Sequence, residues 1–483
     1  MRQTFFFYDL ETSGLNPRED RIMQFAGQRT DMNLNSIGDP VNLLVKLDDD
    51  TLPSPDAIMV TKITPQQTKS DGLSEREFCR YVMDEIFTPG TIATGYNSVR
   101  FDDEFMRAIF WRNFFDPYEW QWRDGRSRWD LLDVVRLTRA LRPEGINWPF
   151  QKKTKKSANN TDSPADKSAD EPNTTDEQDD DLIATNRLEL ITKLNGIEHA
   201  HAHDALSDVE ALISVTRLIR EKQPKLFEYL FNIRDKRHVS QLVNLKKPQP
   251  FVYASGRYSG KFNKTTIAYP LTEGRNNTIL VYDLRYSPER TMKELDKKHA
   301  YFPAVKEFSA NKCPAVAPLG VMSVGDGWQR IGLDEETVNK NLESLLKHPE
   351  MVEDIHNAPE PKFEPAIDPE SAIYDGFLKD QDHIRAESIR NSSPEQLKNF
   401  HMKFDDPRLP ELLLHYKARN YPVALDENEL KTWEEYRTAR LNRQAPAFTK
   451  ALERLKTTGK TLRGDDVDPY ILEELSLWYQ SLL

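Results

Sequence analysis

The sequence predicts an α/β domain, then a small β-rich domain, and then a helical domain. Over residues 1–222, strand-like apolar runs alternate with helical patterns, as in an α/β domain. From about residue 250, short strand-like segments are separated by Gly, Asn and Pro turns. After about residue 358, apolar residues recur at helical spacing. We therefore expect domains at 1–222, 223–360 and 361–483.

The first domain is expected to begin with three antiparallel strands, at Thr4–Leu10, Arg21–Thr30 and Val41–Leu47. The turn-rich segment Asn33–Gly38 joins the second of these strands to the third. A fourth strand of the same domain is expected at Thr91–Tyr96.

Helices of the first domain are marked by their N-terminal residues. Thr64-Pro65 is typical of an N-cap followed by proline at the first helical position. Ser74 and Glu77 form a capping box, which predicts a helix that continues to about Phe87. Further helices are expected in three segments: Phe101–Phe114, Arg187–Leu194 and Asp204–Glu221.

The segment Gln151–Asp181 is rich in Lys, Ser, Asn, Thr and Asp and shows no apolar periodicity. It is predicted to be a disordered surface insertion. In the second domain, strands are expected at Phe251–Ser255, Thr265–Tyr269, Thr278–Leu284 and Val316–Val321. In the third domain, helices are expected at Asp406–Arg419, Glu427–Arg443 and Asp468–Leu482.

Composition excludes several classes of protein. A chain of 483 residues is too long for a single core, and no apolar stretch approaches the roughly 20 residues that cross a bilayer. Two cysteines, Cys79 and Cys313, form neither a disulfide framework nor a zinc cluster. The net charge of −12 argues against a protein that coats nucleic acid. The N-terminus lacks the features of a secretory signal, so we expect a cytoplasmic enzyme.

Two carboxylates, Asp9 and Glu11, stand where the first apolar strand ends. Successive side chains of a strand point to opposite faces, so these two share one face. Hard divalent cations such as Mg²⁺ take carboxylate oxygens as ligands. The pair is therefore half of a candidate metal site, although such a pattern alone is also typical of an ordinary polar strand end.

Asp102 lies where the strand Thr91–Tyr96 leads into a helix, a usual ligand position in α/β sheets. An Asp at a helix start is also a common cap. Farther along, His203 precedes a helix, and Asp208 falls in its first turn. His199 and Asp204 have the same separation, but the apolar helical face that follows Asp208 favours the pair His203 and Asp208.

These residue types suit metal-assisted hydrolysis. Two metal ions about 3.5–4 Å apart clamp the attacking and leaving oxygens, which requires several carboxylates. A histidine titrates near the operating pH, as a general base should. In sequence order, the candidate catalytic residues are Asp9, Glu11, Asp102, His203 and Asp208.

This set resembles the DEDD superfamily of 3′→5′ exonucleases, in the subgroup with the pattern H-x-A-x-x-D, which His203–Asp208 matches. The resemblance implies that the four carboxylates bind two Mg²⁺ ions, which Mn²⁺ can replace. It implies further that Asp9 bridges both ions and that Glu11 also approaches the 3′-terminal nucleotide. His203 would take the proton from the attacking water.

The resemblance extends to the bacterial exonuclease I family over the whole chain. It rests on six stretches: Gly95–Glu104, Arg128–Asp133, Leu141–Pro149, Asn195–His199, Asn311–Pro314 and Tyr374–Phe377. It implies an RNase H-like exonuclease domain, an SH3-like β domain and a helical C-terminal domain, which form a C-shaped clamp. The insertion Gln151–Asp181 is longer than the family leads us to expect.

The family further implies degradation of single-stranded DNA 3′→5′ to 5′-mononucleotides by a monomeric enzyme of DNA repair and recombination. It also implies binding of the C-terminal tail of single-stranded DNA-binding protein. Residues 100–129 contain ten aromatics interleaved with arginines, a pattern that suits single strands, although about half of these rings are expected in the core. By resemblance, the DNA contacts are Arg107, Tyr118, Trp122, Arg136, Arg187, Lys236, Asn277, Lys306 and Asn311.

Three alternatives remain. A 3′→5′ exoribonuclease could share the superfamily fold, but small RNA-trimming relatives usually lack the second and third domains. A catalytically silent nucleic-acid scaffold would be favoured by loss of a metal carboxylate, and all four are present. A zinc site at His199, His201 and His203 lacks cysteine partners.

Overall fold

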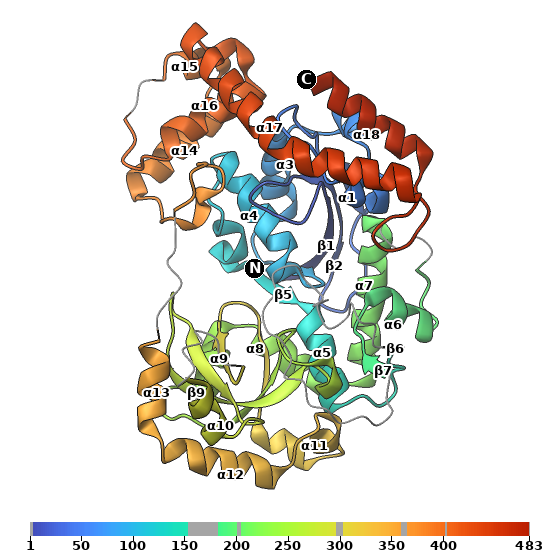
Figure 1. Cartoon of the computed structure of the whole chain (residues 1–483), viewed down its shortest axis with the longest axis vertical. Helices are drawn as coiled ribbons and strands as arrows, with labels where there is room; N and C mark the ends of the chain where they lie inside the picture. The colour runs from blue at the N-terminus through green and yellow to red at the C-terminus, as the bar shows by residue number, and fades with distance from the viewer. Residues whose placement is uncertain are drawn as a thin grey trace.

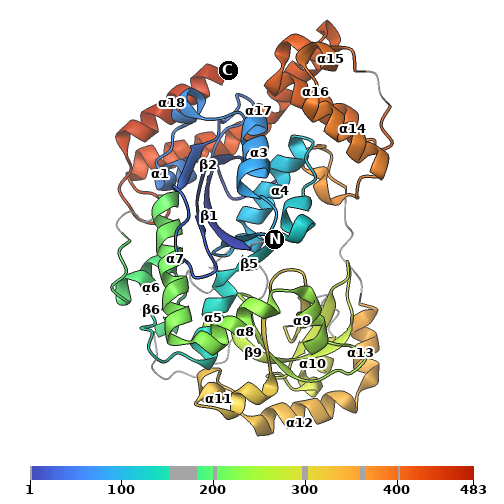
Figure 2. The same cartoon turned by 180° about the vertical axis from the view of Figure 1, so that it is seen from behind.

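The computed structural model describes residues 3–152, 182–199, 204–295, 303–358, 365–400 and 403–482. The first sheet and its helices occupy the middle of the molecule, the second sheet lies at one end, and the C-terminal helices cover the other end (Figures 1 and 2). This arrangement confirms the predicted order of an α/β domain, a β domain and a helical domain.

The first sheet has the strand order β3-β2-β1-β4-β5. Strands β1, β2 and β3 are antiparallel, as predicted, whereas β4 and β5 run parallel to β1. Strand β1 extends beyond the predicted end at Leu10, so both Asp9 and Glu11 lie within the ladder, opposite Ala26 and Gln24 of β2. The bounds are β1 Thr4–Thr12, β2 Ile22–Thr30, β3 Val41–Leu44, β4 Thr91–Gly95 and β5 Ser127–Asp130.

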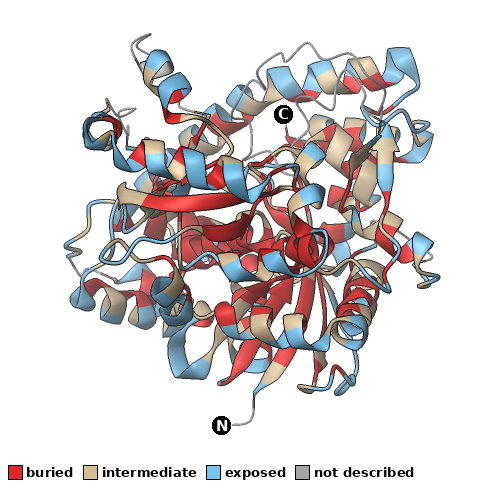
Figure 3. Ribbon diagram, turned by 90° about the horizontal axis from the view of Figure 1, so that it is seen from below, coloured by how far each residue is buried: buried red, intermediate tan, exposed pale blue. Residues whose placement is uncertain are grey.

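Alternation along β1 assigns its side chains to two cores. Phe5 and Phe7 pack into one core, and Phe6, Tyr8 and Leu10 pack into the core on the other face. Buried residues accordingly concentrate along both faces of the sheets (Figure 3). Because the period is two, Asp9 and Glu11 share the face of Phe5 and Phe7, which helix α7 covers.

The N-terminal capping signals are confirmed. Thr64 accepts a hydrogen bond from the Gln67 amide, and Ser74 and Glu77 form the reciprocal capping box. The helix after Ser74 changes to a π-helix at Val82–Ile86. A helix at Leu131–Leu141 was not predicted; the Asp130 side chain caps it. The helices are α1 Pro55–Thr61, α2 Pro65–Asp71, α3 Glu75–Tyr81, α4 Asp102–Arg112, α5 Leu131–Leu141, α6 Leu188–Leu194 and α7 Ala205–Lys222.

A short hairpin flanks the predicted insertion. Strand β6 (Phe150–Lys152) pairs antiparallel with β7 (Leu182–Ala184), so the prediction of disorder from residue 151 begins two residues too early. The rest of that prediction, residues 153–181, lies outside the described residues.

The second sheet has the order β11-β10-β9-β8-β12 and shares one continuous apolar core with α5 and α7 of the first domain. The predicted strand Val316–Val321 is half wrong, because Leu319–Ser323 forms a 3-10 helix. Strand β11 was not predicted, and helices border this sheet. The strands are β8 Phe251–Ala254, β9 Thr265–Glu273, β10 Ile279–Asp283, β11 Val305–Phe308 and β12 Ala315–Pro318. The helices are α8 Pro224–Ile233, α9 Lys236–Leu242, α10 Pro288–Leu295, α11 Gly327–Arg330, α12 Glu335–Leu346 and α13 Pro349–His356.

Helix α17 is longer than predicted. It continues past Arg443 and through Pro446, and it ends at Gly459, whose positive φ of 62° suits glycine. Proline inside a helix costs about 3 kcal/mol, which burial of Phe448, Leu452 and Leu455 offsets. The C-terminal helices are α14 Asp380–Asn391, α15 Pro394–Lys398, α16 Leu409–Asn420, α17 Glu427–Thr458 and α18 Pro469–Leu482. Among the described residues, no helix is long and apolar enough to span a membrane.

A buried ionic cluster joins the C-terminal domain to the first domain. Glu370 is fully buried, and its carboxylate pairs with Arg21 of the first domain at 2.8 Å and with Arg419 of α16 at 2.6 Å. Asp50 of the first domain pairs with the same Arg419 at 2.7 Å, and Arg440 of α17 lies 3.5 Å from Asp50. Each of these charged side chains is removed from water. Loss of any one charge would therefore leave an unpaired buried charge and destabilise the cluster.

Candidate functional site

Three predicted carboxylates converge beside the first sheet. One oxygen from each of Asp9, Glu11 and Asp208 can be chosen so that all three lie within 4.8 Å of one another. Asp9 and Glu11 come from β1, and Asp208 comes from the first turn of α7. Residues that are about 200 positions apart in sequence therefore form one acidic group.

Local structure explains how α7 presents Asp208. The Asp204 side chain caps the helix by accepting a hydrogen bond from the Ser207 amide at 3.1 Å. Val209, Leu212 and Ile213 are buried in the core that also holds Phe5 and Phe7. Because these residues press α7 onto the sheet, its first turn faces the odd-numbered side chains of β1.

Asp102, the fourth predicted carboxylate, is the first residue of α4. Its side chain is buried, and it accepts a hydrogen bond from the backbone of Leu10 in β1. Asp102 does not belong to the group of three carboxylates within 4.8 Å, but its charge acts on both Asp9 and Glu11.

Burial and mutual repulsion raise the pKa of these carboxyls. Burial raises the pKa of Asp9 well above its usual range, and the charges of Asp102, Glu11 and Asp208 raise it further. Burial, Asp208 and Asp102 raise the pKa of Glu11 to about 8. Burial and Asp103 raise the pKa of Asp102 to about 8. Crowded carboxylates repel one another, and a divalent cation among them would reverse that cost. The donor set therefore fits hard divalent ions.

A histidine contacts this group, but it is not the predicted one. His199 Nε2 lies 2.6 Å from Asp208 Oδ1, and His199 Nδ1 lies 3.2 Å from the Thr192 hydroxyl. His203 lies outside the described residues, so its role as general base stays a prediction. Spacing could not separate the two histidines, because each stands five residues before an Asp.

Polar residues that adjoin Asp9 and Asp102 in the sequence form a further hydrogen-bonded network around Asp103. The Tyr8 hydroxyl donates to Asp103 Oδ1 at 2.5 Å, and the Arg128 guanidinium pairs with the same carboxylate. Arg128 also donates to the backbone carbonyl of Asn311 at 2.8 Å, which ties the first domain to the β domain. Sequence reasoning missed Tyr8, because a tyrosine in an apolar strand is indistinguishable from a core residue.

The predicted DNA contacts of the aromatic segment differ in exposure. The Trp122 side chain is 65% exposed, and Tyr118 is half-buried with its ring beside that of Phe377, at a centroid distance of 5.8 Å. Arg107 lies over the Tyr118 ring and pairs with Glu104 at 2.5 Å. Six of the ten rings are buried. This supports the expectation that about half of them belong to the core.

The remaining predicted DNA contacts stay predictions. Some of these side chains are exposed, and others are buried. Arg187, Lys236 and Asn277 are exposed, and Asn277 stands in the turn between β9 and β10. Asn311 is exposed beside Arg128, whereas the Lys306 side chain is largely buried on β11. Arg136 is also buried, and it pairs with Asp133 at 2.7 Å, so its guanidinium is not on the surface of this structure.

A positive cluster that the sequence did not predict lies near Arg107. Lys312, from the loop before β12, is close enough to Glu104, Arg107 and Arg128 to interact electrostatically with them. Lys312 belongs to the β domain, and the other residues belong to the first domain. Only the tertiary structure reveals this cluster, because nothing in the sequence around Lys312 indicates that it lies near Arg107 and Arg128.

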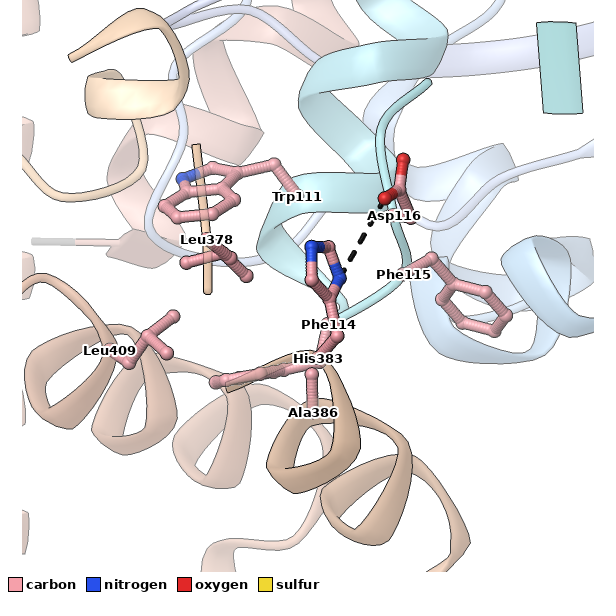
Figure 4. Close-up of a pocket in the computed structure, with 8 residues that line it drawn as sticks. All are labelled: Trp111, Phe114, Phe115, Asp116, Leu378, His383, Ala386 and Leu409. Atoms are coloured by element: carbon pink, nitrogen blue, oxygen red, sulfur yellow. Dashed lines mark ion pairs between the residues drawn. The ribbon is translucent and has the colours of Figure 1, made fainter. Parts of the chain in front are cut away.

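The pocket in Figure 4 lies elsewhere, between α4 and the C-terminal helices. Its lining is mostly apolar, and His383 of α14 faces Asp116 at 3.7 Å. It contains none of the predicted site residues. The lining residues are Trp111, Phe114, Phe115, Asp116, Leu378, His383, Ala386 and Leu409.

Comparisons with known proteins agree with this arrangement. Family models match three segments: "Exonuclease" over residues 6–161, "Exonuclease I SH3-like domain" over 234–358 and "Exonuclease I C-terminal domain" over 367–482. The exodeoxyribonuclease I of Haemophilus influenzae is 37% identical over 472 residues, which cover 94% of this chain and 93% of that protein.

Two solved structures of the Escherichia coli enzyme are similar over the whole chain. The crystal structure of E. coli exonuclease I with a dA16 oligonucleotide has a TM-score of 0.86 and 32% identity, and the match covers 100% of both chains. The zinc-bound form of the E. coli enzyme in complex with single-stranded DNA has a TM-score of 0.87 and 33% identity, again with 100% coverage of both chains.

Proposed function

The chain belongs to the exonuclease I family, and from this premise we propose that it degrades single-stranded DNA 3′→5′ to 5′-mononucleotides. The observation that carries the proposal is the convergence of Asp9, Glu11 and Asp208 on one face of the first sheet, with the charge of Asp102 acting on Asp9. Several carboxylates in such a group suit two-metal hydrolysis of a phosphodiester.

Asp9, Glu11, Asp102 and Asp208 are the residues that would hold two Mg²⁺ ions, or Mn²⁺ in their place. Bound ions would supply charge neutralisation and a polarised water for phosphodiester hydrolysis. The carboxylate oxygens suit oxygen-preferring cations. A bound cation would also offset the burial and mutual repulsion that raise the pKa values of Asp9 and Glu11. His203 would act as general base. His199 would hold Asp208 in place through its 2.6 Å contact.

The strand would approach along Arg107, Tyr118 and Trp122, with further contacts from the β domain. Exposed aromatic rings stack on bases without sequence preference, and arginines bind the backbone phosphates. We further propose that the enzyme is a cytoplasmic monomer of DNA repair and recombination, and that it binds the C-terminal tail of single-stranded DNA-binding protein.

The substrate class can be tested with 3′-labelled oligonucleotides in Mg²⁺. We expect rapid release of label from single-stranded DNA, little release from a blunt duplex, and none after EDTA. A 5′-labelled strand should shorten one nucleotide at a time, which defines the polarity. Equal cleavage of RNA and DNA would instead support an exoribonuclease, and no cleavage of any strand would support a binding scaffold.

Trp122→Ala is expected to weaken binding of single-stranded DNA by about 1–3 kcal/mol, because one exposed stacking ring is lost. Fluorescence anisotropy with a labelled oligonucleotide in EDTA measures this effect without cleavage. Trp122→Phe is the matched control, since it keeps a ring and should retain most of the affinity. An unchanged dissociation constant for Trp122→Ala would remove Trp122 from the DNA path.

A further inference from the structure

The turn that follows α6 brings a histidine to the carboxylate group. Helix α6 ends at Leu194, and Gly196 follows with a positive φ of 66°, a conformation that suits glycine. The Ile197 amide then donates to the Thr192 carbonyl at 3.0 Å, so the chain turns back beside the helix. His199 comes two residues later, and its side chain is only 5% exposed. A buried imidazole requires hydrogen-bond partners.

Both ring nitrogens of His199 have such a partner. Nδ1 lies 3.2 Å from the Thr192 hydroxyl, and Nε2 lies 2.6 Å from Asp208 Oδ1. An ionised carboxylate only accepts hydrogen bonds, so Nε2 carries the hydrogen of the second contact. The Thr192 contact fixes the plane of the ring, whichever of its two atoms donates. A carboxylate has two oxygens, so Asp208 can bond to His199 and still offer an oxygen to a cation.

Thr192 is a rigid anchor for this row of side chains. It is fully buried, and its hydroxyl lies 3.1 Å from the Leu188 carbonyl and 3.0 Å from the Glu189 carbonyl of its own helix. Helix α6 packs against α7, as Figures 1 and 2 both show, and Ile191 of α6 shares the core that holds Val209 of α7. The distance between Thr192 and the first turn of α7 is therefore set by packed helices.

We propose that Thr192 and His199 are positioning residues that set the affinity of the carboxylate group for divalent ions. The inference rests on the proposed function. Neither residue would contact the ion or the strand. Both would act through Asp208, because a carboxylate that is already oriented loses less rotational freedom when an ion binds. Helix α6, which supplies none of the predicted metal ligands, would thereby determine how much metal the enzyme needs.

Binding of Mn²⁺ alone, followed by the electron paramagnetic resonance signal of the free ion, tests the proposal without DNA. We expect His199→Leu to weaken Mn²⁺ binding about tenfold or more, as for loss of other partners of metal ligands. His199→Gln offers an amide N–H in place of Nε2–H and should retain most of the affinity. Unchanged or tighter binding by His199→Leu would overturn the proposal.

The second anchor gives an independent test with a conservative pair. Thr192→Val removes the hydroxyl and nearly preserves the shape of the side chain, so it should weaken Mn²⁺ binding in the same direction but by less. Thr192→Ser keeps the hydroxyl and should bind Mn²⁺ as the wild type does. This pair decides the question if His199→Leu does not fold. Equal affinities of Thr192→Val and Thr192→Ser would contradict the role of Thr192.

Cleavage at varied Mn²⁺ concentration separates positioning from catalysis. For His199→Leu, we expect the concentration that gives half-maximal cleavage to rise about tenfold, with a nearly normal rate at saturating Mn²⁺. A general base behaves in the opposite way: its loss would lower the saturated rate about 10²-fold or more and leave Mn²⁺ binding unchanged, which would overturn the proposal.

A surface histidine provides the matched control. His348 Nδ1 lies 2.8 Å from an oxygen of Glu350, and Glu350 is exposed, so His348→Leu also removes a histidine–carboxylate contact. This variant should bind Mn²⁺ and cleave as the wild type does. Wild-type protein that binds Mn²⁺ but fails to cleave single-stranded DNA would refute the proposed function, a result distinct from unchanged Mn²⁺ affinity in His199→Leu.

Discussion

Asp9→Asn is expected to abolish nucleotide release from single-stranded DNA while leaving binding of the strand intact. Asp9 is the carboxylate on which Asp102, Glu11 and Asp208 all act. Asp9 would help to hold the metal ions, so its loss would remove several kcal/mol of transition-state stabilisation, or about 10³-fold or more in rate. Release of a 3′ label measures cleavage, and anisotropy in EDTA measures binding.

Stability provides a second measurement on the same variant. Asn removes one of four crowded acidic groups, so the unfolding temperature without metal should not fall. Mg²⁺ should raise that temperature in the wild type and should no longer do so in Asp9→Asn. Asp84→Asn, an exposed carboxylate on the π-helix, is the matched control and should cleave normally. Undiminished cleavage by Asp9→Asn would refute the site assignment.

Glu370→Gln is expected to destabilise the contact between the first and C-terminal domains by about 3–5 kcal/mol. The substitution nearly preserves volume but removes the negative charge between Arg21 and Arg419, which are buried with it. His415 Nδ1, 3.0 Å from the same carboxylate, loses its charged partner as well. Calorimetry should show the unfolding midpoint lowered by roughly 10 °C.

The same carboxylate predicts how the effect depends on pH. Burial alone would raise the pKa of Glu370, but Arg419 and Arg21 hold it well below its usual range. A depressed pKa contributes stability above the unfolded-state value of about 4.3, and this stability is lost as the pH falls further. The difference in stability between the wild type and Glu370→Gln should therefore begin to shrink as the pH falls below about 4.3, and it should vanish only below the depressed pKa of the folded state.

Glu435→Gln is the matched control for the buried cluster. Glu435 lies exposed on α17, 3.9 Å from Lys431, so its substitution should change stability by less than about 0.5 kcal/mol. An unchanged midpoint for Glu370→Gln would show that apolar packing alone holds the C-terminal domain in place.

Local sequence was sufficient for the elements that carry the first two carboxylates. The continuous apolar run that begins at Phe5 indicates a strand, and side chains two residues apart in a strand share a face, so Asp9 and Glu11 had to share one. Capping residues located the starts of α2 and α3. Helix α17 is longer than predicted. Local propensity would place Pro446 at a helix end, but packing against α1 and α18 stabilises the helix on both sides of this proline.

The resemblance of Asp9, Glu11, Asp102, His203 and Asp208 to a superfamily pattern was enough to predict a metal-dependent nuclease, because residue type and order are read directly from the chain. Contacts between side chains from distant segments were revealed only by the tertiary structure. Asn311 beside Arg128 and Glu370 between two arginines both depend on the packing of one domain against another. The periodicity of a single segment contains no information about such contacts, since they form between side chains hundreds of residues apart.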